Sequence, residues 1–374
     1  MRIIGVSTLC LLAAIVWPAA TAAGADSGQS GSTKLAYEIS NEAFNLQTPH
    51  KALVGGVAVK LTSDKGEIDI NGNKVALAGA FLGADQAIGV DVNGNGTVEQ
   101  SEVRRVVLGT VAFKVKVGAD KKEVGIGFQK IAMAAKPAVK PGGPNVVSAM
   151  SCCVFPAGCL KGSVNGAQVR ILDDNLDGKI TQDGKDSIVI GSSMFAQPLM
   201  KQHLIGNALY ELKVSEDGTS LDYAKVSDVK LDKVDVPLMK SPAVGCLVLV
   251  DDSTGRVVDV AANKTGIPAG SYKLCYGTIG AGIYMLTIRP TTKMAAMDVK
   301  DEGANNLKIG PAFKLDFKAT YNAAKNVVTV MPFFTVEGAG NERYDVALTS
   351  SMLAPMVTFM EGNRTISRES MSYG

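Results

Sequence analysis

The sequence predicts an all-β, mainly antiparallel fold in which two related β modules with acidic loops precede an immunoglobulin-like β-sandwich. Forty of the 374 residues are glycine, and because a glycine costs about 1 kcal/mol against alanine inside a helix, long helices are disfavoured. Apolar and polar residues alternate with a period of two over short runs bounded by turn residues, which is typical of half-buried strands. The order hairpin, acidic loop and strand occurs twice, which indicates a duplicated module.

Alternating segments define the repeated plan of the chain. Three of them have similar sequences: 111–117, 207–214 and 311–317. Asp120-Lys121 and Asp217-Gly218 follow the first two segments closely and are turn signals. Asn71-Gly72 and Asn165-Gly166 lie between apolar runs, and Asn-Gly in that setting is the strongest short-range hairpin signal. We therefore expect hairpins in both modules.

Composition divides the chain into five predicted parts. Residues 134–145 hold three prolines and two adjacent glycines, which is the pattern of a linker. The predicted parts are a signal peptide (1–25), a first β module (34–133), this linker (134–145), a second β module (146–236) and an immunoglobulin-like sandwich (237–374).

The first 25 residues have the composition of an export signal. Met1-Arg2 supplies a positive start, residues 3–17 are mostly apolar, and Ala20-Thr21-Ala22 has the A-x-A pattern of a cleavage site. The apolar core has the length typical of a signal peptide, whereas a membrane span needs about 20 apolar residues. A permanent N-terminal anchor is the alternative. We expect cleavage near Ala22–Ala25 and a secreted, periplasmic or cell-envelope protein.

The mature chain has no segment that predicts a transmembrane helix, and its charge disfavours binding to nucleic acid. The chain carries 38 Lys and Arg against 36 Asp and Glu, a formal net charge of +2, and the loss of Arg2 with the signal lowers this charge by one. A nearly neutral protein has no global field that attracts nucleic acid or anionic membranes. The expected partner is an unidentified protein or a component of the cell envelope.

Five cysteines remain after the signal is removed: Cys152, Cys153, Cys159, Cys246 and Cys275. In an oxidising compartment this odd number allows at most two intrachain disulfides and leaves one thiol. Cys246 and Cys275 lie in two strand-like segments and are one candidate pair. Cys159 with either Cys152 or Cys153 is the other pair, because their spacing matches no zinc motif and no CxxC.

The strongest chemical signal is the segment 91–102, which we call loop 1. It fits the twelve-residue EF-hand calcium loop, with Gly96 at the sharp turn of position 6 and a carboxylate at position 12. Calcium takes six to eight oxygen ligands, and the carbonyl of position 7 supplies one of them. A solvated turn rich in Asp and Asn is the alternative. The expected ligands are Asp91, Asn93, Asn95, Thr97, Glu99 and Glu102.

A second acidic segment, 173–186, repeats the first half of this pattern, and we call it loop 2. Position 12 is Gly184, so the closing carboxylate has to come from Asp183 or Asp186. Strand-like sequences precede and follow the loop, which predicts a calcium loop between strands and not between helices. The expected ligands are Asp173, Asn175, Asp177, Lys179, Asp183 and Asp186. More carboxylates gather in loop 2 than in loop 1, and we therefore expect it to bind Ca²⁺ more tightly.

Short motifs give two family resemblances. The strand, the acidic loop Asp173–Gly178, the next strand and the segment 209–221 together resemble a group of uncharacterised secreted bacterial β-rich proteins with EF-hand-like calcium loops. Residues 338–344 and 372–374 are also similar to that group. The passage Pro-Ala-Gly-Ser-Tyr-Lys-Leu at 268–274 resembles the strand entry of carboxypeptidase-regulatory-like and prealbumin-like sandwich domains. The resemblances imply export and a β-rich fold, and they imply no activity.

Enzyme motifs are missing from the sequence. It contains no GxSxG, HExxH or CxxC, and His50 and His203 are its two histidines. We expect no catalytic residues and predict an exported, non-enzymatic calcium-binding protein with an envelope-structural or adhesive role. The alternative is an extracellular hydrolase whose carboxylate-based site leaves no local motif.

Signal cleavage gives the first testable prediction. Mass spectrometry of the exported protein is expected to show an N-terminus between Ala23 and Asp26. Trp17 is the single tryptophan of the chain, so the mature protein is expected to lack tryptophan fluorescence. Tryptophan emission from purified exported protein would contradict the cleavage.

Overall fold

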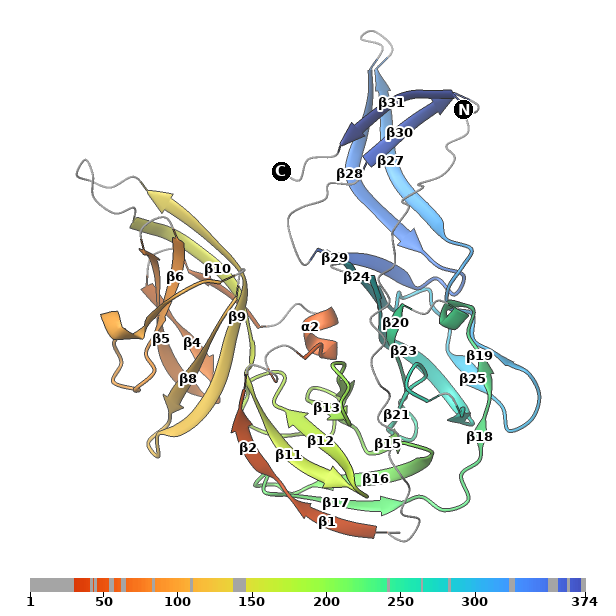
Figure 1. Ribbon diagram of the computed structural model, residues 1–374, viewed down its shortest axis with the longest axis horizontal. Coiled ribbons are helices and arrows are strands. Elements are labelled where there is room, and N and C mark those ends of the chain that lie inside the picture. The colour runs from red at the N-terminus through yellow and green to blue at the C-terminus, as the bar shows by residue number, and fades with distance from the viewer. Residues whose placement is uncertain are drawn as a thin grey trace. The chain divides into compact units, whose positions relative to one another are not determined.

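The fold is almost entirely β and mainly antiparallel, which confirms the predicted fold class (Figure 1). The structure, a computed structural model, describes residues 30–40, 43, 46–53, 57–61, 65–82, 85–107, 110–136, 146–240, 243–263, 265–281, 284–322, 327–348, 356–361 and 364–370. The predicted signal peptide lies outside the described residues.

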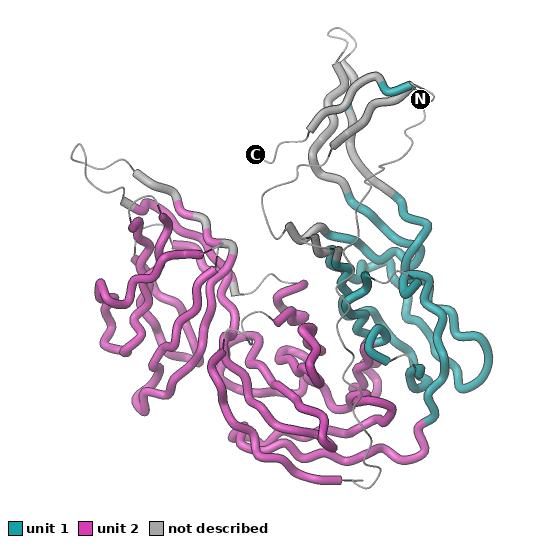
Figure 2. Tube along the Cα trace, in the orientation of Figure 1, with its two compact units in different colours: residues 1–21, 230–249, 260–374 teal, residues 22–229, 250–259 magenta. Residues whose placement is uncertain are grey.

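The chain divides into two compact units (Figure 2). Unit 2 comprises residues 22–229 and 250–259, and unit 1 comprises residues 1–21, 230–249 and 260–374. Both acidic loops belong to unit 2. Unit 2 itself contains two sandwich-like lobes, which we call lobe A (57–156) and lobe B (the described residues of 30–53, with 157–229 and 250–259).

Lobe A consists of two antiparallel sheets of four strands each. One sheet has the order β4 (Lys65–Ile70), β5 (Asn73–Leu82), β6 (Asp85–Val90) and β7 (Val103–Arg105). The other has the order β3 (Val57–Leu61), β10 (Val146–Pro156), β9 (Lys122–Lys136) and β8 (Val111–Val117). The short 3-10 helix η1 (Gln100–Glu102) precedes β7.

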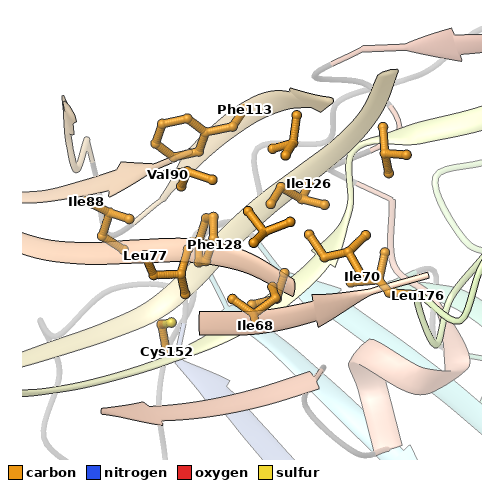
Figure 3. Packing of buried hydrophobic residues seen from close by; sticks show 14 of the residues in the cluster. Ile68, Ile70, Leu77, Ile88, Val90, Phe113, Ile126, Phe128, Cys152 and Leu176 are labelled. Atoms are coloured by element: carbon orange, nitrogen blue, oxygen red, sulfur yellow. The ribbon is translucent and has the colours of Figure 1, made fainter. Parts of the chain in front are cut away.

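The core of lobe A is formed by the inward faces of both sheets (Figure 3). In β8 the side chains of Phe113, Val115 and Val117 are buried, while the two lysines between them are exposed, as the period of two predicts. Phe113 meets Phe128 of β9 edge-to-face, with ring centroids 5.8 Å apart. One member of this core, Leu176, comes from lobe B.

Lobe B also combines two sheets, and its buried hydrophobic residues form two clusters of different membership. The first has the order β14 (Gln197–Pro198), β13 (Ser187–Ile190), β12 (Ala167–Leu172), β11 (Gly158–Val164) and β2 (Ala36–Ile39). The strands of the second that lie in unit 2 are β1 (Ser30–Lys34), β17 (Ser220–Lys225), β16 (Ala208–Val214), β15 (Gln202–Ile205) and β21 (Arg256–Asp259). β15 and β21 are parallel. The helix α2 (Pro49–Leu53) also belongs to this lobe.

Two predicted boundaries need correction. β1 and β2 pair with β17 and β11, so the strands near residue 34 belong to lobe B and not to the first module. β9 continues to Lys136, opposite Val146 of β10, so residues 134–136 are part of a strand and 137–145 lie outside the described residues. The proline segment therefore joins two paired strands of lobe A, and the chain passes into lobe B only after β10.

The predicted Asn-Gly hairpin turns both form. Asn71 has a φ of 56° between β4 and β5, and Asn165 has a φ of 46° between β11 and β12. Glycines with positive φ follow both residues, as a type I′ turn requires. In lobe B the strand after the turn leads directly into loop 2, whereas in lobe A an additional strand, β6, precedes loop 1.

In unit 1 the described strands follow one hydrogen-bonded path beside several short ladders. The path is β20 (Val244–Asp251), β23 (Gly270–Ala281), β24 (Tyr284–Arg289), β29 (Arg343–Leu348), β28 (Val327–Glu337) and β27 (Lys314–Asn322). The ladders pair β25 (Met297–Val299) with β23, β18 (Leu231–Asp232) with β22 (Ile267–Pro268), β19 (Val234–Asp235) with β26 (Asn305–Asn306), and β30 (Met356–Glu361) with β31 (Arg364–Ser370). The 3-10 helix η2 is Pro237–Lys240. The immunoglobulin-like arrangement stays a prediction.

A buried carboxylate organises the turn before β29. Glu342 is fully buried, and its Oε1 accepts hydrogen bonds from the Gly310 N–H at 2.7 Å and the Tyr344 hydroxyl at 2.8 Å. Its Oε2 accepts the Gly340 N–H at 2.9 Å. Two donors that lie close to Glu342 in the chain and one from the distant Gly310 offset the cost of burying this charge.

The structure contains none of the predicted disulfides, because all five cysteines are thiols. Cys152 faces the core of lobe A, whereas Cys159 packs in a separate cluster with Leu172. Burial raises the pKa of Cys152 to about 12, which makes its thiolate scarce at neutral pH. In unit 1 the Cys246 sulfur lies 3.5 Å from the Thr278 hydroxyl.

No helix among the described residues reaches the length and apolar character that a bilayer crossing needs.

His203 predicts a pH dependence of stability. Its ring is fully buried in β15, its Nε2 accepts the Met200 N–H at 3.2 Å, and its Nδ1 lies 3.3 Å from Gln197 Oε1. Burial lowers its pKa from 6.5 to about 4. The unfolded state therefore binds the proton first, so this contribution to stability is complete above pH 6.5 and is lost as the pH falls toward 4.

The expected loss is about 3 kcal/mol between pH 7 and pH 4, because each unit of pKa shift corresponds to about 1.4 kcal/mol. Guanidinium denaturation of wild type and His203→Gln at several pH values measures it. The variant is expected to show a shallower slope in this range. An equal slope in both proteins would contradict the assignment.

Candidate metal centres

Both acidic loops lie between strands of unit 2. Loop 1 joins β6 to β7 and ends with η1, and loop 2 joins β12 to β13. No long helix flanks either loop, so the EF-hand-like spacing is presented here by sheets.

In loop 1 the carboxylate of position 1 organises the backbone of the loop. Asp91 is buried, its Oδ2 accepts the Gly96 N–H at 2.7 Å, and its Oδ1 accepts the Asn95 N–H at 3.1 Å. The Thr97 N–H donates to Asn95 Oδ1 at 2.9 Å. Gly96 has a φ of +84°, a conformation that residues with a Cβ rarely adopt. The glycine at position 6 is therefore required by the turn.

Loop 2 repeats these hydrogen bonds with different side chains. Asp173 Oδ2 accepts the Gly178 N–H at 2.8 Å, and Asp173 Oδ1 accepts the Asp177 N–H at 3.1 Å. The Lys179 N–H donates to Asp177 Oδ1 at 2.9 Å. Gly178 has a φ of +81°. Positions 1, 5, 6 and 7 are thus equivalent in the two loops.

The closing carboxylate of loop 1 is Glu102, at position 12. It is buried, and its Oε1 accepts the N–H groups of Val92 at 3.1 Å and Asn93 at 3.3 Å. Its Oε2 accepts the Glu99 N–H at 2.9 Å. One oxygen therefore bonds to the start of the loop and the other to position 9.

In loop 2 the same task is performed by Asp186, at position 14. Asp186 is fully buried, its Oδ1 accepts the Asp174 N–H of position 2 at 3.1 Å, and its Oδ2 accepts the Thr181 N–H of position 9 at 2.6 Å. Loop 2 is two residues longer than loop 1 up to its closing carboxylate, and the side chain of Asp186 is one methylene shorter than that of Glu102. The structure thereby distinguishes between the two residues that the sequence left open.

Asp183 points out of loop 2. Its carboxylate is paired with Lys185 Nζ at 2.7 Å and accepts the Thr181 hydroxyl at 2.7 Å. These two contacts hold the pKa of Asp183 at about 2. The side chain remains solvent-exposed, so Asp183 is placed at the rim and not among the inner oxygens.

One side-chain oxygen inside loop 1 receives no hydrogen bond from the described residues. Asn93 Oδ1, at position 3, is buried and is without a hydrogen-bond partner within the described part of the chain. A buried acceptor that is left unpaired costs free energy. A cation beside it would satisfy this oxygen. Glu99, by contrast, accepts the Asn95 side-chain amide at 2.9 Å and is exposed at the rim.

In loop 2 the side-chain oxygens of positions 3 and 5 accept hydrogen bonds from other groups of the same loop. Asn175 Oδ1 accepts the Asp177 N–H at 3.1 Å, while the Asn175 amide donates to Asp177 Oδ2 at 2.9 Å. Asp174, which the spacing does not assign as a ligand, accepts the hydroxyls of Thr48 at 2.7 Å and Ser187 at 2.8 Å. Its carboxylate therefore ties the loop to Thr48, which directly precedes α2, and to β13 within lobe B.

Burial and mutual repulsion disfavour the charged carboxylates of loop 2. Burial, with a smaller contribution from nearby Asp177, raises the pKa of Asp173 to about 6. Burial, with contributions from Asp173 and Asp177, raises the pKa of Asp186 to about 7. A cation bound in the loop would oppose both effects.

The donor set of both loops consists of oxygens. In the described part of the chain, no three His, Cys, Asp or Glu side chains are close enough together to hold a metal ion. Carboxylates stand at positions 1 and 12 of loop 1 and at positions 1, 5 and 14 of loop 2, and side-chain amides stand at positions 3 and 5 of loop 1 and at position 3 of loop 2. Oxygen-only donors are what Ca²⁺ prefers, whereas zinc and copper sites use sulfur or imidazole.

Loop 2 is open to solvent on one side. A pocket of about 100 Å³ is lined by Asp173, Gly178, Tyr37, Lys122 and Asp217, with other residues of lobes A and B. The Tyr37 hydroxyl accepts the Gly125 N–H of lobe A at 3.0 Å. The pocket thus lies beside the carboxylate at position 1 of the loop.

Comparisons with known proteins found no match, either to a protein-family model, to a curated protein or to a solved structure.

The assignment of Asp186 as the closing residue predicts a difference between two neighbouring carboxylates. Asp186→Ala leaves the buried N–H groups of Asp174 and Thr181 without acceptors and is expected to destabilise the protein by about 1–3 kcal/mol. Asp183→Ala removes an exposed side chain and is expected to change stability by less than about 0.5 kcal/mol. Chemical denaturation in the presence of a chelator measures both, and hydrogen exchange over residues 173–190 reports on the loop. Equal effects of the two substitutions would contradict the assignment.

Proposed function

We propose that this is an exported calcium-binding β protein, in which each acidic loop of unit 2 holds one Ca²⁺. The observation that carries the proposal is the shared hydrogen-bond pattern of the two loops. Asp91 and Asp173 bond to the glycines of position 6, and Glu102 and Asp186 each bond to positions 2 and 9. The two loops share this pattern although the closing residue is a glutamate at position 12 in loop 1 and an aspartate at position 14 in loop 2. The shared pattern therefore does not result from identical spacing of the closing residue, and it supports a common role of the two loops.

The two sites use different ligand sets. In loop 1 we assign Asp91, Asn93, Asn95, the Thr97 carbonyl and Glu102 as ligands, with Glu99 at the rim. In loop 2 we assign Asp173, Asn175, Asp177, the Lys179 carbonyl and Asp186. Loop 2 contributes three carboxylates and loop 1 contributes two, so the prediction that loop 2 binds more tightly is kept.

Calcium in these loops would serve stability rather than chemistry. Each ion replaces the repulsion among gathered carboxylates by attraction and favours the folded loop over the unfolded chain. A signal-bearing, nearly neutral, β-rich chain with ion-stiffened loops suits an envelope-structural or adhesive role. Its partner would be a protein or another envelope component.

Calcium is expected to raise the melting temperature of the mature wild-type protein. Binding to the folded state adds RT ln(1 + [Ca²⁺]/Kd), which is about 2.7 kcal/mol per site at a hundredfold excess over Kd. Asp173→Ala is expected to remove the tighter site and Asp91→Ala the weaker one, since each deletes the position-1 carboxylate. Calorimetric titration and thermal unfolding with calcium or chelator measure both effects.

Asp183→Ala serves as the matched control, because it removes a carboxylate from the rim of the same loop. It is expected to keep both binding events. A melting temperature of wild type that does not change in millimolar calcium would show that the loops are only turns, and the proposed function would be wrong.

A further inference from the structure

Leu176, at position 4 of loop 2, is packed in the core of the other lobe. Its side chain is 5% exposed and belongs to the cluster formed by lobe A, which includes Ile68 and Ile70 of β4. Figure 3 shows Leu176 beside Ile70. A loop that belongs to lobe B by its strands therefore completes the hydrophobic core of lobe A.

The backbone and the neighbouring glycine strengthen this contact. The N–H of Asn71, in the turn between β4 and β5, donates to the Leu176 carbonyl at 3.0 Å. A Cβ added to Gly178 would lie 2.6 Å from Asn71 Cγ, so the turn of lobe A lies directly against position 6 of the loop. Positions 4 and 6 of loop 2 are thus both in contact with the β4–β5 hairpin.

Comparison of the two loops shows that the loop conformation does not require a leucine at position 4. Position 4 of loop 1 is Gly94 with a φ of +71°, and Leu176 has a φ of +59°. The left-handed conformation is unfavourable for a residue with a Cβ and easy for glycine. The apolar burial of the leucine in lobe A offsets that strain.

Loop 1 has no room for an equivalent side chain. A Cβ on Gly94 would lie 2.9 Å from the Lys116 carbonyl of β8, and the Lys116 N–H donates to the Val92 carbonyl at 3.0 Å. Loop 1 therefore packs against a strand of its own lobe. Only loop 2, of the two, has a side chain of the loop in the core of the other lobe.

We infer that Leu176 is a positioning residue that couples Ca²⁺ binding in loop 2 to the stability of the β4–β5 hairpin in lobe A. The inference rests on the proposed function, since it takes Ca²⁺ as the ligand of loop 2. When the ion orders positions 3, 5 and 7, it also fixes the backbone of position 4, which lies among them. Leu176, at position 4, in turn stabilises the β4–β5 hairpin. Because coupling of this kind is reciprocal, a well-packed lobe A also raises the calcium affinity of loop 2.

The test is hydrogen exchange of the β4 and β5 amides with calcium or chelator, in the full mature chain. All proteins carry Asp91→Ala, because calcium in loop 1 would protect lobe A directly. If opening of the hairpin releases the ion, protection rises by the factor 1 + [Ca²⁺]/Kd, up to about 100-fold at a hundredfold excess.

Leu176→Gly, which adopts the left-handed conformation without strain as Gly94 does, is expected to keep a calorimetric calcium signal and to lose most of the calcium-dependent protection of β4 and β5. Leu176→Ala is the second variant, since it truncates the side chain but keeps a Cβ in the strained conformation. The matched control is Ile180→Ala, because Ile180 lies in the same loop but packs on the core of lobe B. This control is expected to keep the calcium-dependent protection.

Calorimetry separates the two proposals. If the Asp91→Ala protein gives a heat of calcium binding but the hydrogen-exchange protection of β4 and β5 is the same with calcium and with chelator, the coupling is wrong and the calcium site of loop 2 stands. Undiminished protection in Leu176→Gly and Leu176→Ala also overturns it. Absence of calcium heat from wild type overturns the proposed function and the coupling together.

Discussion

The structure of each acidic loop depends on one hydrogen bond, from the N–H of the glycine at position 6 to the carboxylate at position 1. In loop 1 it joins Gly96 to Asp91 and in loop 2 it joins Gly178 to Asp173. The bond reverses the chain within six residues, and only a left-handed glycine fits the reversal without strain. The closing carboxylate bonds to positions 2 and 9 of the same loop.

Buried carboxylates organise other parts of the protein in the same way. Glu342 joins three donors in unit 1, and Asp174 joins Thr48 and Ser187 in lobe B. In each case several donors offset the cost of removing a charge from water. Loop 1 differs from these sites because one of its buried oxygens, Asn93 Oδ1, has no hydrogen-bond donor within the described part of the chain.

The contact between lobes A and B gives the two loops different surroundings. The composition of residues 134–145 predicted a linker between the two modules. The strands on either side of the proline segment, β9 and β10, instead pair within lobe A, and Leu176 of loop 2 packs in the core of that lobe. Loop 1 is thus a local feature of lobe A, whereas loop 2, which joins strands of lobe B, also contacts lobe A through Leu176.

The sequence by itself determined the features that arise within a few neighbouring residues. Alternation predicted the strand of Phe113, Val115 and Val117, Asn-Gly predicted the hairpin turns, and the loop spacing predicted Asp91, Asp173 and their glycines. These patterns are readable because strand period, turn conformation and loop closure are local properties.

Only the tertiary structure decided which distant segments meet. It closed loop 2 with Asp186 and not with Asp183, and it assigned β1 and β2 to lobe B. It also kept Cys152 and Cys159 apart as thiols in separate clusters and placed Leu176 against Asn71. The physical reason is that packing and burial depend on partners far apart in the chain, and no local pattern records where a second strand, a core or a buried N–H will lie.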